Sequence, residues 1–84
     1  MLTHETAIQI LRDGKCFLQH DLFTDETGFA YIMGIDKRTA QNYRVMGTGP
    51  RHSYSSRILY DVDEIVRWYA EWMVKRGGGE TRSD

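Results

Sequence analysis

The sequence predicts a small, mainly α-helical fold with one β-hairpin in its second half. Segments with apolar side chains at helical spacing alternate with cap residues and glycines, which is the pattern of several short helices. Gly47-Thr48-Gly49-Pro50 then stops the helical pattern, and residues 51–60 follow as two short extended runs. Because the chain has 84 residues, of which 40% are hydrophobic, we expect it to build a single core.

The first predicted helix covers residues 5–13. Thr3 can cap its start and Gly14 can end it, and its apolar face comprises Ala7, Ile8, Ile10 and Leu11. Residues 15–23 contain several apolar side chains without a regular period, so we expect a connector there.

A second helix is predicted to begin after Thr24. Asp25 and Glu26 place negative charge in its first turn, where it complements the helix dipole. The helix is expected to end near Met33, just before Gly34. The side chains expected to face the core are Phe29, Ile32 and Met33.

A tight corner and a third helix follow. Gly34 can take the left-handed conformation that ends one helix, Ile35 can fill the angle, and Asp36 can cap the next helix. That helix is predicted over residues 37–46, and its inward-facing side chains are Ala40, Tyr43 and Met46. Its other faces carry cations and amides, namely Lys37, Arg38, Gln41, Asn42 and Arg44.

These cations and amides have the donor and acceptor types that read base edges in DNA. Arg and Lys pair with guanine and Gln or Asn with adenine in the major groove, and further cations bind phosphates. The alternative is a solvated amphipathic helix, because charged helix faces are common. Residues 37–46 are therefore the candidate recognition segment, with the solvated face as the competing interpretation.

The predicted hairpin pairs a strand at Tyr54 with residues 58–60. Ser55 and Ser56 mark its tip, with Arg57 beside them. A two-stranded hairpin is marginal alone, so it must pack on the helices, and its tip is free to reach a neighbouring groove or backbone.

Asp61-x-x-Glu64 is a capping-box pattern that opens a last helix. This helix is expected to end at residues 75–76, and residues 77–84 are expected to form a flexible tail. Its apolar side comprises Ile65, Trp68, Tyr69, Trp72 and Met73, which we expect to lie mainly in the core. Tyr69 and Trp72 cover more of the helix surface than one small domain easily buries, so an aromatic patch at a dimer interface is the alternative.

Positive charge is concentrated in the candidate recognition segment. Residues 36–60 hold five basic residues and one acidic residue, a formal charge of +4. Residues 1–35 hold two basic and five acidic residues, a charge of −3, and residues 61–84 hold four and six, a charge of −2. This polarity can steer the protein toward phosphates, but so few cations predict modest affinity for a single copy.

Several other classes of function lack a signal in the sequence. The single Cys16 cannot form an internal disulfide, and Cys16-x3-His20 supplies only two of the four ligands of a structural zinc site, so we expect an inert thiol and no metal. No nucleophile stands in a catalytic context, which predicts neither an enzyme nor a cofactor. No long apolar run or leader pattern is present, so we expect a cytoplasmic protein without membrane contact.

Several short motifs occur in a fixed order over residues 24–72. They are Gly34-Ile35-Asp36-Lys37-Arg38-Thr39, Gln41-Asn42-Tyr43, Gly47-Thr48-Gly49-Pro50, Tyr60 and Trp68. In this order they resemble the excisionase and MerR-type winged helix-turn-helix domains of phages and mobile elements. The runs Leu59-Tyr60-Asp61 and Arg67-Trp68-Tyr69-Ala70-Glu71 are also similar to the DNA-binding domain of phage terminase small subunits.

The resemblance implies a winged helix-turn-helix domain over residues 24–76, preceded by an extra N-terminal helix and connector in residues 1–23. Residues 37–46 would enter the major groove of double-stranded DNA, and the hairpin would touch the minor groove or the adjacent backbone. The DNA contacts that it implies are Lys37, Arg38, Gln41, Asn42 and Arg44 in the helix and Arg51, Ser55, Ser56 and Arg57 in the wing.

Two functions are therefore open at this stage. The first is a small phage-type, sequence-specific DNA-binding protein: an excisionase-like recombination factor, a transcription regulator or a terminase small subunit. It would act as a homodimer or cooperative oligomer, with an integrase or terminase as partner. The second is a protein-interaction module, such as a phage-encoded inhibitor or adaptor, that reuses the fold without DNA.

Overall fold

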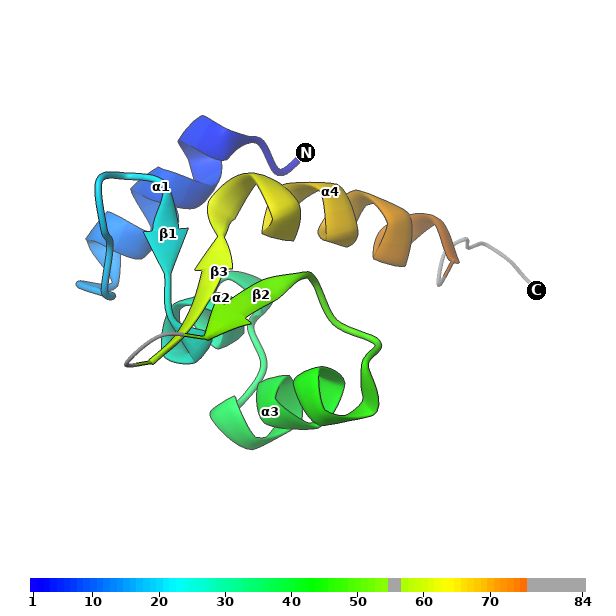
Figure 1. Cartoon of the computed structure of the whole chain (residues 1–84). Coiled ribbons are helices and arrows are strands. Elements are labelled where there is room, and N and C mark those ends of the chain that lie inside the picture. Colours follow the sequence, from blue (N-terminus) through cyan, green and yellow to red (C-terminus); the bar gives the residue numbers. More distant parts are fainter. Residues whose placement is uncertain (55–56, 76–84) are drawn as a thin grey trace.

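The protein is mainly helical, with a small antiparallel sheet at its centre. The computed structural model describes residues 1–54 and 57–75. Within them the elements are α1 (His4–Asp13), β1 (Phe23–Thr24), α2 (Glu26–Met33), α3 (Lys37–Met46), β2 (His52–Tyr54), β3 (Ile58–Asp61) and α4 (Val62–Met73). In Figure 1, α1 and α4 lie along the top and α3 at the bottom, with the sheet and α2 between them.

Each helix begins at a side chain that accepts a hydrogen bond from the first turn. Thr3 accepts from the Thr6 amide at 3.1 Å, and Asp36 accepts from the Thr39 amide at 2.7 Å. These bonds satisfy amides that have no partner within the helix. The predicted starts of α1, α3 and α4 are confirmed, and α4 ends at Met73, slightly earlier than expected.

The start of α2 and the end of the connector differ from the prediction. Asp25 caps α2 by accepting from the Gly28 amide at 3.0 Å, while Thr24 belongs to β1. Thr24 is fully buried, and its hydroxyl donates to the Phe17 carbonyl at 2.7 Å. Two residues are too short to show a strand period, so β1 has no signature in the sequence.

β1 adds a third strand to the predicted hairpin. The strand order is β1-β3-β2, with Thr24 opposite Tyr60 and Tyr54 opposite Ile58. The hairpin itself is confirmed, whereas its predicted tip at Ser55 and Ser56 and the predicted tail at residues 77–84 lie outside the described residues. β1 thereby connects the first part of the chain to the sheet.

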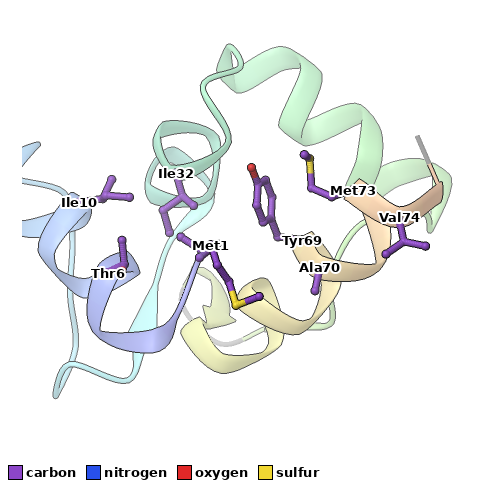
Figure 2. A pocket seen from close by; sticks show the side chains of 9 residues that line it. Met1, Thr6, Ile10, Ile32, Tyr69, Ala70, Met73 and Val74 are labelled. Atoms are coloured by element: carbon purple, nitrogen blue, oxygen red, sulfur yellow. The ribbon is translucent and has the colours of Figure 1, made fainter. Parts of the chain in front are cut away.

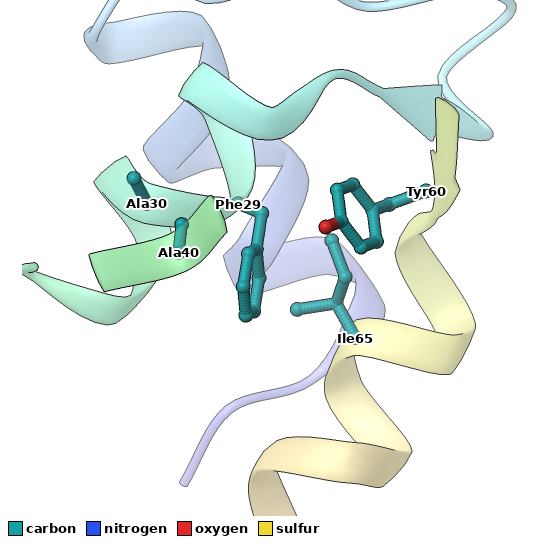
Figure 3. Packing of buried hydrophobic residues seen from close by; sticks show 5 residues of the cluster. All are labelled: Phe29, Ala30, Ala40, Tyr60 and Ile65. Carbon is teal, nitrogen blue, oxygen red and sulfur yellow. The ribbon is translucent and has the colours of Figure 1, made fainter. Parts of the chain in front are cut away.

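Two groups of buried side chains form the core. Phe29, Ala30, Ala40, Tyr60 and Ile65 make the first, and Figure 3 shows them converging from α2, α3, β3 and α4. Ala30 and Ala40 are small, which lets α2 and α3 approach closely. The second group joins α1 to the start of α4 and comprises Ala7, Ile8, Leu11 and Val62.

Trp68 connects α4 to α2 and α3. Its ring lies edge-on to Phe29 at 5.6 Å and to Tyr43 at 5.5 Å between ring centroids. Its indole N–H donates to the Thr48 carbonyl at 2.9 Å, just after α3 ends. The expectation that Trp68 packs with the core is therefore confirmed.

Two methionines that the sequence pattern predicts to face the core are exposed in the structure. Met46 is 74% exposed and Met73 is 47% exposed. Residues spaced by three drift around a helix by about 60° per step, so Met46 points about 120° away from Ala40.

No helix in the described part of the chain is long and apolar enough to cross a membrane.

Gly28 packs so tightly that even a methyl group has no room. A Cβ atom there would lie 1.9 Å from the Thr24 hydroxyl oxygen and 3.0 Å from Leu11 Cδ2. Although Gly→Ala usually stabilises a helix, Gly28→Ala is expected to destabilise this fold by about 1–3 kcal/mol because of overpacking. The measurement is urea unfolding of the variant beside Thr27→Ala, an exposed neighbour on the same helix. A Gly28→Ala protein as stable as the parent would contradict this packing.

Candidate nucleic-acid interface

The outer face of α3 carries most of the side chains predicted to contact DNA. Lys37, Arg38, Gln41 and Asn42 are all exposed. They lie on the two turns that follow the α2–α3 corner, while Ala40 on the opposite face is fully buried. The structure thus brings four of the five predicted helix contacts together on one solvent-facing surface.

The corner that presents α3 has the predicted geometry. Gly34 has a φ of 70°, in the left-handed region that favours glycine, and Ile35 packs against the core. Hydrogen bonds from the Thr39 side chain and amide hold the pKa of Asp36 below its usual value. The cap is therefore charged at neutral pH, and its stabilising effect is lost only as the pH falls through this lowered pKa.

Arg44 does not lie on the exposed face, so the prediction that it faces outward with the other four residues is wrong. Its Nε donates to Glu26 Oε2 at 2.7 Å, and the two side chains are only 14% and 10% exposed. Its Nη1 also donates to the Tyr54 hydroxyl at 3.1 Å. Arg44 therefore joins α3 to α2 and β2 and is not available as a free cation for DNA.

Tyr60 completes this polar cluster from β3. Its hydroxyl donates to Glu26 Oε2 at 3.1 Å, and its ring is fully buried beside Phe29 at 4.9 Å between centroids. Burial, together with the nearby Glu26 carboxylate, raises the pKa of Tyr60 far above its usual value, so the hydroxyl stays protonated. The hydrogen bonds to Glu26 raise the pKa of Arg44 as well. We refer to Glu26, Arg44, Tyr54 and Tyr60 as the Glu26 cluster.

The hairpin contributes cations at both ends of α3. Arg51 and His52 line a hollow of about 300 Å³ with Gly47 and Gly49, at the C-terminal end of α3. Arg57 and Lys37 line another, of about 320 Å³, at the N-terminal end. Cations therefore flank the exposed face of α3 at both of its ends.

Arg57 is only partly available among these cations. Its guanidinium lies 3.6 Å from the Asp25 carboxylate and 4.3 Å from the centre of the Phe17 ring. Its side chain remains 52% exposed, so it can still meet a phosphate. The two wing serines predicted to contact DNA, Ser55 and Ser56, lie outside the described residues.

An apolar groove lies between α1, α2 and α4. It has a volume of about 600 Å³ and is lined mainly by aliphatic and methionine side chains. Figure 2 shows the Tyr69 ring projecting into it from α4, with Ile32 of α2 and Met1 nearby. No local sequence pattern predicts this groove, because it combines residues from both ends of the chain.

The apolar residues at the end of α3 were also missed as surface residues. Val45 is 67% exposed and adjoins the exposed Met46. Val45 lies four residues after Gln41, so helical spacing predicts that it shares the outer face with Gln41.

Cys16 is half-buried near α1. Burial raises the pKa of its thiol, as suits an unreactive cysteine.

Comparison of the chain with protein-family models, curated proteins and solved structures finds no match. Its functional assignment therefore rests on the residues and their geometry.

The interior position of Arg44 leads to a stability prediction. Arg44→Ala removes the charged partner of the buried Glu26 carboxylate and is expected to cost about 1–3 kcal/mol in the free energy of unfolding. Arg38→Ala, on the exposed face of the same helix, is expected to change it by less than about 0.5 kcal/mol. Urea unfolding monitored by tryptophan fluorescence measures both. Equal stabilities for the two variants would show that the Glu26 cluster does not hold α3 in place.

Proposed function

We propose that this chain is a winged helix-turn-helix protein that binds double-stranded DNA. In this proposal α2 and α3 are the helix-turn-helix, α3 lies in the major groove, and the β2–β3 hairpin is the wing beside it. The observation that carries the proposal is the exposed set of Lys37, Arg38, Gln41 and Asn42 on a helix whose other face is fixed to the core.

The dimensions of α3 suit this role. Ten residues make a helix about 15 Å long and, with side chains, about 10–12 Å across. The major groove of B-DNA is about 12 Å wide, so it admits a helix of this size. The inner side of α3 packs against α2 and the Glu26 cluster. Its outer side, with Lys37, Arg38, Gln41 and Asn42, faces solvent.

The charge pattern supports DNA over a protein partner. Five of the chain's eleven basic residues fall in residues 36–60, where only Asp36 is acidic, and Asp36 is occupied as a helix cap. Without Arg44, which is paired with Glu26, four of these cations remain for DNA. A protein-interaction module has no need of cations and amides gathered on one helix face. Such a module would instead use the apolar groove between α1, α2 and α4, which lies apart from these residues.

Three biological processes are compatible with the proposed DNA-binding step. Excision, transcription control and DNA packaging differ in partner proteins and in the arrangement of sites, whereas the reading helix can be the same. We propose a phage-type protein that acts in one of these three processes and binds as several copies or with an integrase or terminase. The acidic remainder of the chain favours this cooperative mode, because one copy neutralises few phosphates.

The proposal predicts a strong dependence of DNA affinity on salt. With Lys37, Arg38, Arg51 and Arg57 as the cations that face the duplex and displace its counterions, affinity per copy is expected to fall roughly 100-fold between about 50 and 200 mM salt. Arg38→Ala is expected to weaken binding and to reduce the salt dependence. Fluorescence anisotropy with a labelled duplex of mixed sequence measures both effects.

Arg67→Ala is the matched control for Arg38→Ala. Arg67 is 65% exposed and lies on α4, where it pairs with Glu64, so its loss should leave DNA affinity almost unchanged. Absence of binding at low salt would rule out the proposed function. Equal losses in the two variants would show that attraction is not localised to α3.

A further inference from the structure

The side chains on the outer face of α3 change in type from one end of the helix to the other. Two rows of residues spaced by four run along the helix, one through Lys37, Gln41 and Val45 and the other through Arg38, Asn42 and Met46. Each row passes from a cation to an amide and then to an apolar side chain. Because residues four apart are neighbours on a helix surface, the two rows form one continuous strip.

The apolar end of this strip has no structural explanation within the described residues. Val45 and Met46 are 67% and 74% exposed, and neither belongs to the two groups of buried residues or to the side chains packed against them. They also lie outside the linings of the apolar groove and of the two hollows beside the hairpin. Two large adjacent apolar side chains are thus presented to solvent beside base-reading amides.

DNA offers one apolar group in the major groove, the C5-methyl of thymine. A strip with amides in its middle and aliphatic side chains at its end therefore matches adenine followed by thymine methyls. From residue 37 to residue 45 the helix rises about 12 Å, which corresponds to about four base pairs at about 3.4 Å each. Cations at the first turn match guanine at the other end of this short site.

We propose that Val45 and Met46 are specificity-determining residues that contact thymine methyl groups. The target of one copy is then a site of about four base pairs in the major groove, with guanine under the first turn of α3 and A·T pairs under its middle and last turn. This inference rests on the proposed DNA-binding function and adds the base preference and its direction along the helix.

The test uses thymine and uracil, which differ only by the methyl group. The full chain is first used to select its preferred duplex from a random library at low salt. Each thymine of the selected site is then replaced singly by deoxyuridine, and affinity is measured by fluorescence anisotropy. Replacement at one or two positions is expected to weaken binding about threefold to tenfold, while replacement in the flanking sequence has no effect.

Variants assign the effect to the proposed residues. Val45→Ala and Met46→Ala are expected to bind the thymine and uracil duplexes more equally, whereas Val74→Ala keeps the full difference. Val74 is the matched control because it is 77% exposed and directly follows α4, where it lines the apolar groove. Circular dichroism of each variant checks that the fold is retained. The comparison of thymine and uracil duplexes with the wild-type protein does not depend on the folding of any variant.

The outcomes separate this inference from the proposed function. If the wild-type protein binds a selected duplex but no thymine replacement matters, or if the selected sites lack A·T pairs, the inference is wrong and DNA binding stands. If no duplex is bound at low salt, both are wrong. If Val74→Ala removes the thymine preference as strongly as Val45→Ala, Val45 and Met46 are not the contacts.

Discussion

The buried ion pair between Glu26 and Arg44 is the interaction on which the arrangement of α3 and the hairpin depends. Its central group is the Glu26 carboxylate. It lies in the first turn of α2, where its charge also complements the helix dipole. A buried carboxylate is costly unless it is paired and hydrogen-bonded, and here Arg44 of α3 and Tyr60 of β3 provide both. Arg44 in turn reaches Tyr54 of β2, so one buried charge joins two helices and both strands of the hairpin.

This arrangement fixes the hairpin relative to α3. A short helix and a two-stranded hairpin are each marginal alone, so their relative position must come from tertiary contacts. The Glu26 cluster supplies the polar part of these contacts, while Ala40 and Tyr43 supply the apolar part through α2 and Trp68. The cations of the hairpin are consequently held at both ends of the exposed face of α3.

The local features of the fold could be predicted from sequence because each depends on neighbouring residues. Thr3, Gly34 and Asp36 act within one turn of the chain, and their roles as caps and corner are confirmed. Arg44 could not be placed, because its partner lies eighteen positions earlier and a charged residue on a helix is exposed by default. β1 was missed since its pairing with β3 is a long-range contact made by only two residues.

In the candidate site, too, features that depend on neighbouring residues could be predicted, whereas long-range contacts could not. The exposure of Lys37, Arg38, Gln41 and Asn42 follows from helical periodicity, so the sequence was sufficient to group them. The flanking hollows at Arg51 and Arg57 depend on how the hairpin packs on α3, which periodicity does not specify. The apolar end of the face at Met46 was misplaced because a spacing of three was taken as one face.

A backbone NMR titration tests whether α3 and the hairpin form one DNA-binding surface, as we propose. A ¹⁵N-labelled sample of the full chain is titrated with a short duplex at low salt, and amide shift changes are mapped onto the fold. We expect changes concentrated in Lys37–Met46 and at Arg51, His52 and Arg57, with little change at Thr6, Ile10 and Ala70 around the apolar groove. Changes concentrated around that groove, or none at all, would contradict this proposal.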